Sequence, residues 1–354
     1  SRRQRQLCIR DSISIFDKMN HKYITCTGFG GTGSSVISDL MKEFDNVKSC
    51  GSDFEMSIAF ATDGISDLQH YIVDDFERNK TAEGIYRFRR MASIISKEYS
   101  NKLHFDFISA VDKYLQSLVL TNWNGYNYLH QLRYGKVCRF FYYDLPFRIQ
   151  GRLRKLFPSK DGYERASKMK KTLPIEISIG ETNFFKATNT FFETMLDSID
   201  SNNNFSYLCF DQLVPAYNFK RYSKYFPNLK IIVIDRDPRD LYLLNKLYWN
   251  EGWIPSKDVE VYINWFRLLR LQLTSDLKTE NVLYIRFEDT IYDYENTIDK
   301  IINFIGLSKS NHIHKKEYFI PEISIKNTKL WEKHPEYMID LNRIESTLKE
   351  YCYI

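Results

Sequence analysis

The sequence predicts an α/β fold, a three-layer sandwich with a central parallel sheet and a mainly helical insert. Two segments, residues 23–44 and 229–249, each show a short apolar strand followed by a turn and an amphipathic helix. Alternating strands and helices favour a parallel sheet that is covered by helices on both faces. A long stretch between these two segments has apolar residues at helical spacing, which predicts the insert.

The first strand-to-helix segment is "YITCTGFGGTGSSVISDLMKEF". We expect a strand at 23–27, a turn rich in glycine, and a helix at 34–44. The second segment is "LKIIVIDRDPRDLYLLNKLYW", and its residues 229–234 are nearly all apolar. Such a run suits a strand that is buried on both faces of a parallel sheet.

The other elements follow from the same patterns. Strands are predicted for "SYLCF" and "NVLYIRFEDTI", and a helical pattern runs from about residue 65 to 135. Further helices are predicted for "NFFKATNTFFETMLDSI", "WFRLLRLQLTSDL", "ENTIDKIINFIGL" and "RIESTLKEYCYI", and Gly306 is expected to close the third of these. We predict a single domain over residues 1–354, with 65–205 as an inserted and mainly helical region.

Length and composition limit the class of protein. The 354 residues are 43% hydrophobic and 27% charged, which is enough to bury a sizeable core. A formal net charge of +5 admits an anionic ligand but is too small to indicate nucleic acid. The six cysteines are scattered without metal-ligand spacing, so we expect no metal site and reduced thiols in a cytoplasmic protein. The sequence has no apolar run near the ~20 residues of a membrane span and no visible signal peptide.

The glycine turn is the first candidate binding site. Its glycines allow a tight turn that points amide N–H groups at an anion, and the following helix adds the positive end of its dipole. The residues expected to contact the anion are Gly30, Gly31, Thr32, Gly33, Ser34 and Ser35. The nucleotide-triphosphate pattern GxxxxGK[ST] requires a lysine where this chain has Ser34, whereas the dinucleotide pattern GxGxxG is met at 28–33. The turn by itself indicates a phosphate-binding loop, with a structural glycine turn as the alternative.

A second anion site is predicted where the buried strand at 229–234 ends. Arg236 follows in the stretch "IDRDPRD" and offers a planar guanidinium with a fixed fork of donors. Parallel sheets bind ligands at the carboxyl ends of adjacent strands, so this fork and the glycine turn are expected to lie at one edge. The alternative for Arg236 is a surface ion pair with Asp235 or Asp240.

Three stretches resemble the sulfotransferase superfamily, whose donor is 3′-phosphoadenosine-5′-phosphosulfate (PAPS). They are residues 30–35, 234–240 and 282–307, and they occur in the order of the family. A weaker match at 324–331 is similar to the C-terminal basic loop that closes over the nucleotide. The matching pieces span most of residues 23–350, although the middle third matches nothing recognisable. The resemblance implies a P-loop-like arrangement of the predicted sheet.

The resemblance also implies an activity and a set of ligands. A member of the family moves a sulfuryl group from PAPS to an acceptor and releases 3′-phosphoadenosine-5′-phosphate (PAP), without a metal ion. Loop 30–35 would bind the 5′-phosphosulfate, Arg236 the 3′-phosphate, and Lys326 and Asn327 would close over the nucleotide. The remaining charged residues of the motifs are expected to hold these turns in place, and they are Arg239, Arg286, Glu288 and Asp289.

Two positions depart from the pattern of the family. The family carries Lys or Arg at the position of Gly31, so charge on the leaving phosphate requires backbone amides or another cation. Candidates for that cation are Arg87, Arg89 and Arg90. The family's second ligand of the 3′-phosphate is a serine at the position of Leu244, and the neighbouring Asn245 is expected to substitute.

The acceptor's proton is predicted to pass to a carboxylate. One branch of the family uses a histidine upstream of the arginine motif, but the corresponding stretch here, "CFDQLVP", offers Asp211 and no histidine. Other branches place a carboxylate shortly after the loop helix, where "GSDFEM" contains Glu55. We rank Glu55 first and Asp211 second as the catalytic base. A helix cap or an ion pair is the alternative role of each.

The acceptor is expected to bind the insert at 65–205. Aromatic residues there are candidates for stacking on sugars, and they are Trp123, Tyr126, Tyr128, Phe140, Phe141, Tyr142 and Tyr143. The basic run at 148–171 suits an anionic glycan, a peripheral contact with the inner face of a membrane, or a solvated helix. The composition is typical of a low-G·C bacterium, so a surface glycan or its precursor is our first choice of acceptor. A sterol-like or other small hydrophobic alcohol is the second.

Two other classes of protein stay open on the sequence. One is a nucleotide-dependent kinase or oxidoreductase that uses the same glycine loop. The other is a non-catalytic, nucleotide-binding member of the fold, which the departure at Gly31 favours. The sequence indicates no oligomeric state.

Overall fold

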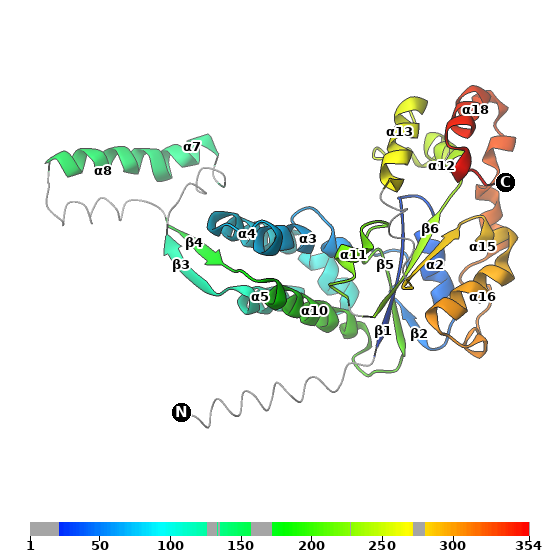
Figure 1. The fold of residues 1–354 in the computed structure, drawn as a ribbon, viewed down its shortest axis with the longest axis horizontal. Helices are drawn as coiled ribbons and strands as arrows, with labels where there is room; N and C mark the ends of the chain where they lie inside the picture. Colours follow the sequence, from blue (N-terminus) through cyan, green and yellow to red (C-terminus); the bar gives the residue numbers. More distant parts are fainter. Residues whose placement is uncertain are drawn as a thin grey trace. The chain divides into compact units, whose positions relative to one another are not determined.

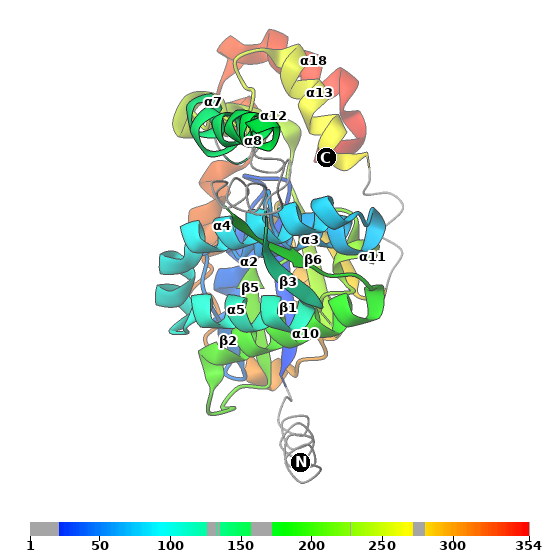
Figure 2. The same cartoon turned by 90° about the vertical axis from the view of Figure 1, so that its left-hand side faces the viewer.

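The computed structural model describes residues 21–125, 133, 135–156, 172–226, 228–271 and 280–353. The chain divides into two compact units, drawn from two sides in Figures 1 and 2. Unit 1 is made of the described residues up to 61, of 98–106 and of those from 189 onward, and unit 2 of those in 62–97 and 107–188. The predicted insert at 65–205 contains all but the first residues of unit 2, while its parts at 98–106 and 189–205 cluster with unit 1. The prediction of one domain with an acceptor-binding insert stays a prediction.

A five-stranded parallel sheet forms the centre of unit 1, in the order β2-β5-β1-β6-β7. The strands are β1 (Lys22–Gly28), β2 (Val47–Ser49), β5 (Tyr207–Asp211), β6 (Leu229–Asp235) and β7 (Val282–Arg286). Strand β1 lies between β5 and β6, so both of its edges are paired with strands that come later in the chain. The predicted α/β class with a central parallel sheet is confirmed, including the strands expected at 23–27 and 229–234.

Helices α2 (Ser34–Met41) and α16 (Tyr294–Ile305) cover one face of this sheet. Ile37 of α2 and Ile301 of α16 belong to one buried cluster with Ile24 and Cys26 of β1. Alternate residues of β1 point to the opposite face. There the Tyr23 hydroxyl donates a hydrogen bond to the Asp197 carboxylate at the end of α10 (Glu181–Asp197), 2.8 Å away. These contacts make the three layers of the predicted sandwich.

A second core forms where the chain leaves β6. It contains buried residues of α12 (Pro238–Leu244), α13 (Val259–Arg270) and α18 (Met338–Thr347). Helix α12 begins sharply because the Asp237 side chain accepts a hydrogen bond from the Arg239 amide and Pro238 occupies the first turn. A π-helical turn, η5 (Asn245–Trp249), continues α12. The short helices of unit 1 are α11 (Phe219–Tyr222), α15 (Asp289–Tyr292) and α17 (Pro321–Ser324).

One predicted helix boundary in unit 1 is refined and another is confirmed. Helix α13 begins six residues earlier than expected because the Asp258 carboxylate caps it, accepting from the amides of Glu260 and Val261. The predicted continuation of this helix beyond residue 271 lies outside the described residues. Helix α16 ends as predicted at Gly306, whose φ of 83° is the left-handed conformation that glycine adopts freely.

Unit 2 is mainly helical. Its helices are α3 (Ile65–Gln69), α4 (Arg78–Leu103), α5 (Phe107–Leu118), α7 (Lys136–Arg139) and α8 (Leu145–Leu156), and the last residues of α4 belong to unit 1. The prediction of helix throughout 65–135 is wrong at β3 (Thr121–Gly125), which pairs antiparallel with β4 (Leu173–Ile177). Ile94, an apolar residue within this helical pattern, is 74% exposed on α4. Periodicity in the sequence cannot report a partner strand about 50 residues away.

No helix in the described ranges is both long and apolar enough to cross a membrane.

Candidate functional site

Three strand ends bring the predicted site residues to one edge of the parallel sheet. In the strand register, Cys26 of β1 lies beside Asp211 of β5, and Gly28 of β1 lies beside Ile234 of β6. The glycine loop therefore emerges between Asp211 on one side and the segment containing Arg236 on the other. Such a position, where neighbouring strands connect in different directions, is the usual place for a ligand in a parallel sheet.

The glycine loop adopts the conformation of an anion-binding turn. Gly30, Gly31 and Gly33 have φ values of 84°, 66° and 107°, which side chains rarely tolerate. The Thr32 hydroxyl is buried and accepts a hydrogen bond from the Phe29 amide at 3.1 Å, which closes the turn. Among the residues that the structure describes, no acceptor is bound by the backbone amides of 30–35. These amides precede or begin helix α2, so they can all serve one anion.

The packing around the loop explains why it contains so many glycines. A Cβ atom on Gly30 would lie 2.3 Å from the Trp253 ring, and one on Gly33 would lie 2.7 Å from the Phe287 ring. A Cβ atom on Gly31 would lie 2.8 Å from the Trp249 ring and 2.9 Å from a methyl group of Leu241. The position where relatives carry a cation is therefore closed to a side chain. Local sequence patterns do not indicate these aromatic neighbours.

Arg236 lies directly against the glycine loop. Its guanidinium donates to the carbonyl oxygen of Gly31 at 3.4 Å and to that of Asn327 at 3.0 Å, and it stacks on the Phe287 ring at 3.9 Å. The side chain is buried, and its Nε has no hydrogen-bond partner in the described parts of the chain. Burial lowers the pKa of Arg236, although neighbouring carboxylates oppose this shift. A buried cation with an unused donor is a site for an anion.

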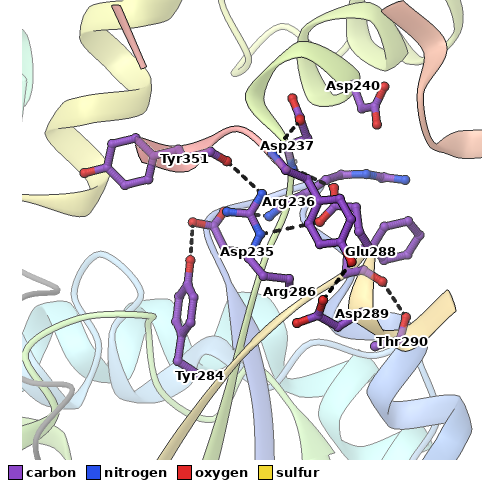
Figure 3. Close-up of polar contacts among 12 residues, drawn as sticks. Asp235, Arg236, Asp237, Asp240, Tyr284, Arg286, Glu288, Asp289, Thr290 and Tyr351 are labelled. Carbon is purple, nitrogen blue, oxygen red and sulfur yellow. Dashed lines mark hydrogen bonds and ion pairs between the residues drawn. The ribbon is translucent and has the colours of Figure 1, made fainter. Parts of the chain in front are cut away.

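The carboxylates around Arg236 accept hydrogen bonds from a backbone amide and from Arg239, and not from the Arg236 guanidinium. The Glu288 carboxylate accepts from the Asp237 amide at 2.8 Å, and the Asp237 carboxylate accepts from Arg239 at 2.7 Å. Figure 3 shows this group of charged residues at the ends of β6 and β7. Arg286 donates to the Tyr351 carbonyl at 2.7 Å. These contacts confirm the structural roles expected for the charged residues beside Arg236.

The buried partner of Asp235 was not predicted. Arg270 of α13 is fully buried, and its Nε donates to the Asp235 carboxylate at 2.8 Å. The Tyr284 hydroxyl donates to the same carboxylate at 2.8 Å (Figure 3). Burial would raise the pKa of Asp235, but Arg270 holds it below its ordinary value. The Arg270 guanidinium also stacks on Phe29 of the glycine loop at 4.3 Å. Asp235 therefore pairs with Arg270, and the alternative of an ion pair between Asp235 and the Arg236 guanidinium is not seen.

The C-terminal loop at 324–331 contacts Arg236. Asp240 fixes this loop, since its carboxylate accepts from the amides of Lys329 at 2.9 Å and Leu330 at 2.7 Å. Burial, together with the charge of Asp237, raises the pKa of Asp240 to about 7. Asn327 contacts Arg236 through its carbonyl oxygen, while the Lys326 side chain is exposed. The roles of Lys326 and Asn327 in binding the nucleotide stay predictions.

Asn245 has a structural position. Its amide nitrogen donates to the Ile254 carbonyl at 2.9 Å and to the Ser256 hydroxyl at 2.8 Å, and its oxygen accepts from the Glu251 amide at 2.8 Å. The side chain therefore holds loop 250–256, the loop that places Trp253 on Gly30. Leu244 is buried in the second core. A role of Asn245 as phosphate ligand stays a prediction, and the contacts of its amide argue against it.

The two predicted carboxylates lie side by side at the end of β5. Glu55 forms an isolated parallel bridge with Asp211, and its carboxylate accepts from the Gln212 amide group at 3.0 Å. Glu55 is exposed, whereas Asp211 is buried with a hydrogen bond from the Ser34 side chain. Burial first, and then the charge of Glu55, raise the pKa of Asp211 to about 7. Asp211 therefore contacts Ser34 at the start of helix α2, and Glu55 lies beside Asp211.

The three arginines that the sequence offered as a substitute cation lie in unit 2. Arg87 pairs with Asp63 at 2.6 Å, and Arg89 donates to Asp112 at 2.9 Å and to Glu176 at 2.8 Å. Arg90 is exposed on α4. Acids of the same unit thus already neutralise two of the candidates. Within the described residues, no group of three or more histidine, cysteine or acidic side chains is arranged to hold a metal ion.

Comparison with known families supports the resemblance seen in the sequence. The Sulfotransferase family model matches residues 146–311, which include Asp211, Arg236 and strands β5 to β7. The resemblance to the sulfotransferase superfamily is confirmed. This sulfotransferase match begins after the glycine loop, so the assignment of the loop rests on its own conformation. No curated protein sequence matches the chain.

Several solved sulfotransferases are similar to the chain. The sulfotransferase domain of the Synechococcus PCC 7002 olefin synthase is 11% identical over 84% of this chain and 78% of that chain, with a TM-score of 0.37. Sulfotransferase STF9 from Mycobacterium avium is 11% identical over 92% and 72%, with a TM-score of 0.35. Sulfotransferase STF1 from Mycobacterium tuberculosis H37Rv is 10% identical over 92% and 80%, with a TM-score of 0.35.

Proposed function

We propose that the protein is a PAPS-dependent sulfotransferase that transfers a sulfuryl group to an acceptor hydroxyl. One observation carries this proposal: the backbone amides of 30–35, which have no described acceptor, adjoin the buried guanidinium of Arg236. A nucleotide with phosphate groups on both sides of its ribose requires two anion sites close together. ATP and NAD carry no phosphate on a ribose hydroxyl, so neither has a group that needs a buried arginine in this place.

The residues present fit the donor at both ends. The amides of 30–35 and the exposed Ser35 hydroxyl would hold the 5′-phosphosulfate, and the Arg236 fork would hold the 3′-phosphate. The free Nε of Arg236 is one donor for that phosphate. Its two present acceptors are neutral carbonyl oxygens, which bind a guanidinium less strongly than phosphate does. When bound, PAPS supplies the activated sulfuryl group.

The chain's own residues would position the acceptor and take its proton. Glu55 is exposed beside the loop, so its carboxylate is accessible to an incoming hydroxyl and remains our first choice of base. Asp211 is the second, because its raised pKa suits proton transfer near neutral pH but its carboxylate is buried. The amides at the start of α2 would stabilise negative charge that develops on the leaving phosphate. They would serve in place of the cation that Gly31 excludes.

For the acceptor we propose a hydroxyl of a bacterial surface glycan or its precursor. Exposed aromatic side chains of unit 2 suit stacking on sugar rings, among them Trp123 on β3, which is 47% exposed. Tyr126 and Tyr128 lie outside the described residues. A sterol-like alcohol is the second choice of acceptor, since an exposed aromatic surface would also accept an apolar ring system.

The test of this function is transfer of labelled sulfate from PAPS to a panel of glycans and hydrophobic alcohols. We expect labelled product from at least one glycan and a loss of turnover in Glu55→Gln. A thermal-shift series with PAP, NAD and ATP supplies the control, since only PAP should raise the melting temperature substantially. Stabilisation by NAD or ATP but not PAP would show that the protein belongs to a different class of nucleotide enzyme.

A non-catalytic binding protein is the second candidate, because Gly31 excludes the cation that relatives carry. In that case PAP would stabilise the protein, yet no acceptor in the panel would become labelled.

A further inference from the structure

Helices α7 and α8, with the π-helical turn η3 (Phe140–Asp144) between them, form a helical run from Lys136 to Leu156 (Figure 1). The proposed nucleotide site at the glycine loop contains no residue of this run. We propose that it binds the surface of a bilayer that contains anionic lipids, as a peripheral contact of unit 2. The proposal rests on two features of the run, its exposed apolar side chains and its charge.

The first feature is the number of large apolar side chains that face water. Val137 is 71% exposed, Phe141 57%, Phe147 58% and Leu156 70%, and Phe140 is 39% exposed and packs edge-on against Phe141. Single exposed apolar residues are common on protein surfaces, whereas several along one helical run are typical of a contact surface. Removing them from water requires a partner with an apolar interior.

The second feature is charge. Residues 136–156 contain six basic residues and one acidic residue, a net charge of +5 that equals the formal net charge of the whole chain. The other residues carry 44 of each sign, since six of 50 basic and one of 45 acidic residues lie in this run. The run is therefore strongly basic for its length, with a net charge of +5 over 21 residues. A negatively charged surface is its electrostatic complement.

The apolar and basic residues share the outward side of the run. Arg148, Arg152 and Lys155 are exposed and follow one another at the spacing of a single helix face. Pro146 and Gln150 are buried on the opposite face. Phe147 precedes Arg148 directly, so its ring leaves the helix about 100° around the axis from that guanidinium, on a flank of the basic face. A bilayer interface accepts both, since rings enter the acyl boundary while cations stay among the headgroups.

Other occupants explain less of this surface. Nucleic acid would attract the cations but would leave Val137 and Leu156 in water. A second copy of the chain would cover the apolar residues but would bring two sets of like charges together. The run is also more cationic than a membrane-spanning segment allows, and no described helix qualifies as a span. An interfacial helix with lysine and arginine on its polar side fits both features.

The test is co-sedimentation of the full chain with vesicles in the absence of any donor nucleotide. We expect binding to vesicles of phosphatidylglycerol and phosphatidylcholine, no binding to phosphatidylcholine alone, and weaker binding as salt is raised. The triple variant Arg148→Gln, Arg152→Gln, Lys155→Gln should bind about 100-fold more weakly, because each surface cation contributes about fivefold. The double variant Phe140→Ser, Phe141→Ser should bind at least about tenfold more weakly.

The control removes the same charge elsewhere in unit 2. Arg90→Gln, Lys97→Gln, Lys113→Gln changes three exposed cations of α4 and α5 and should leave vesicle binding unchanged. Far-ultraviolet circular dichroism confirms that each variant is folded. A Phe141→Trp variant adds a direct reading, since its fluorescence should shift to shorter wavelength and be quenched by brominated lipid.

The proposal is overturned if the wild type ignores anionic vesicles, or if the control variant loses binding as strongly as the α8 variant. It is also overturned if a DNA oligonucleotide binds in place of the vesicles, or if the Phe variants change only the oligomeric state. Because the assay contains no donor or acceptor, its outcome is independent of the proposed sulfuryl transfer.

Discussion

Replacing Gly31 by lysine restores the residue that relatives carry, and the structure predicts that the change is destabilising. Gly31 has a φ of 66°, where a residue with a Cβ atom is disfavoured by about 1–2 kcal/mol. The new Cβ would also lie 2.8 Å from the Trp249 ring and 2.9 Å from a Leu241 methyl group. Overpacking of this kind costs about 1–3 kcal/mol. The sum predicts a loss of about 2–5 kcal/mol in the free energy of unfolding.

Urea denaturation followed by fluorescence measures this loss. Gly252→Ala is the matched control, because no atom lies within 4 Å of a Cβ placed there and its φ is not positive. We expect the control to change the unfolding free energy by less than about 0.5 kcal/mol. Gly31→Ala should account for most of the loss seen in Gly31→Lys, because both share the Cβ atom. If Gly31→Lys is as stable as wild type and gains turnover, our explanation of the missing cation is wrong.

Three further predictions concern the ionisable groups at the strand ends. Arg270→Met should lower the unfolding free energy by about 3–5 kcal/mol, because it leaves the Asp235 carboxylate buried without its cation, and a loss below about 1 kcal/mol would contradict the pairing. The folded-state pKa of Asp211 is raised to about 7, so its contribution to stability is full at low pH and is lost as the pH rises from about 4 to 7. Relative to Asp211→Asn, the wild type should therefore lose up to about 4 kcal/mol over this range in unfolding titrations, and parallel profiles would refute the raised pKa. Arg236→Lys keeps the charge but loses the planar fork, so calorimetry should show PAP binding about 10–100-fold weaker, and unchanged affinity would exclude Arg236 as the ligand.

The parallel sheet, the glycine turn and the position of Arg236 at a strand end could be predicted from the sequence because local patterns encode them. The apolar run at 229–234 indicates a buried strand, and Asp237 with Pro238 indicates the start of a helix. The glycines of 28–33 indicate a tight turn whose exposed groups are mainly backbone amides. Each of these signals is carried by a few consecutive residues, so no knowledge of distant contacts is needed.

The features that the sequence did not reveal all depend on contacts between distant segments. Arg270 pairs with Asp235 across 35 residues, and Trp253 packs on Gly30 across more than 200. Strand β3 pairs with β4 through a connection of about 50 residues. Asn245 looked available as a phosphate ligand because its neighbours in sequence do not show that loop 250–256 uses its amide group.

We propose that one nucleotide bridges the glycine loop and Arg236. Calorimetric binding of PAP and of adenosine 5′-monophosphate, to the wild type and to Arg236→Gln, tests it most directly, since the two ligands differ only in the 3′-phosphate. The wild type should bind PAP about 10–100-fold more tightly than the monophosphate, and Arg236→Gln should bind both ligands equally. Equal affinities in the wild type, or a preference for PAP that survives in the variant, would contradict the claim.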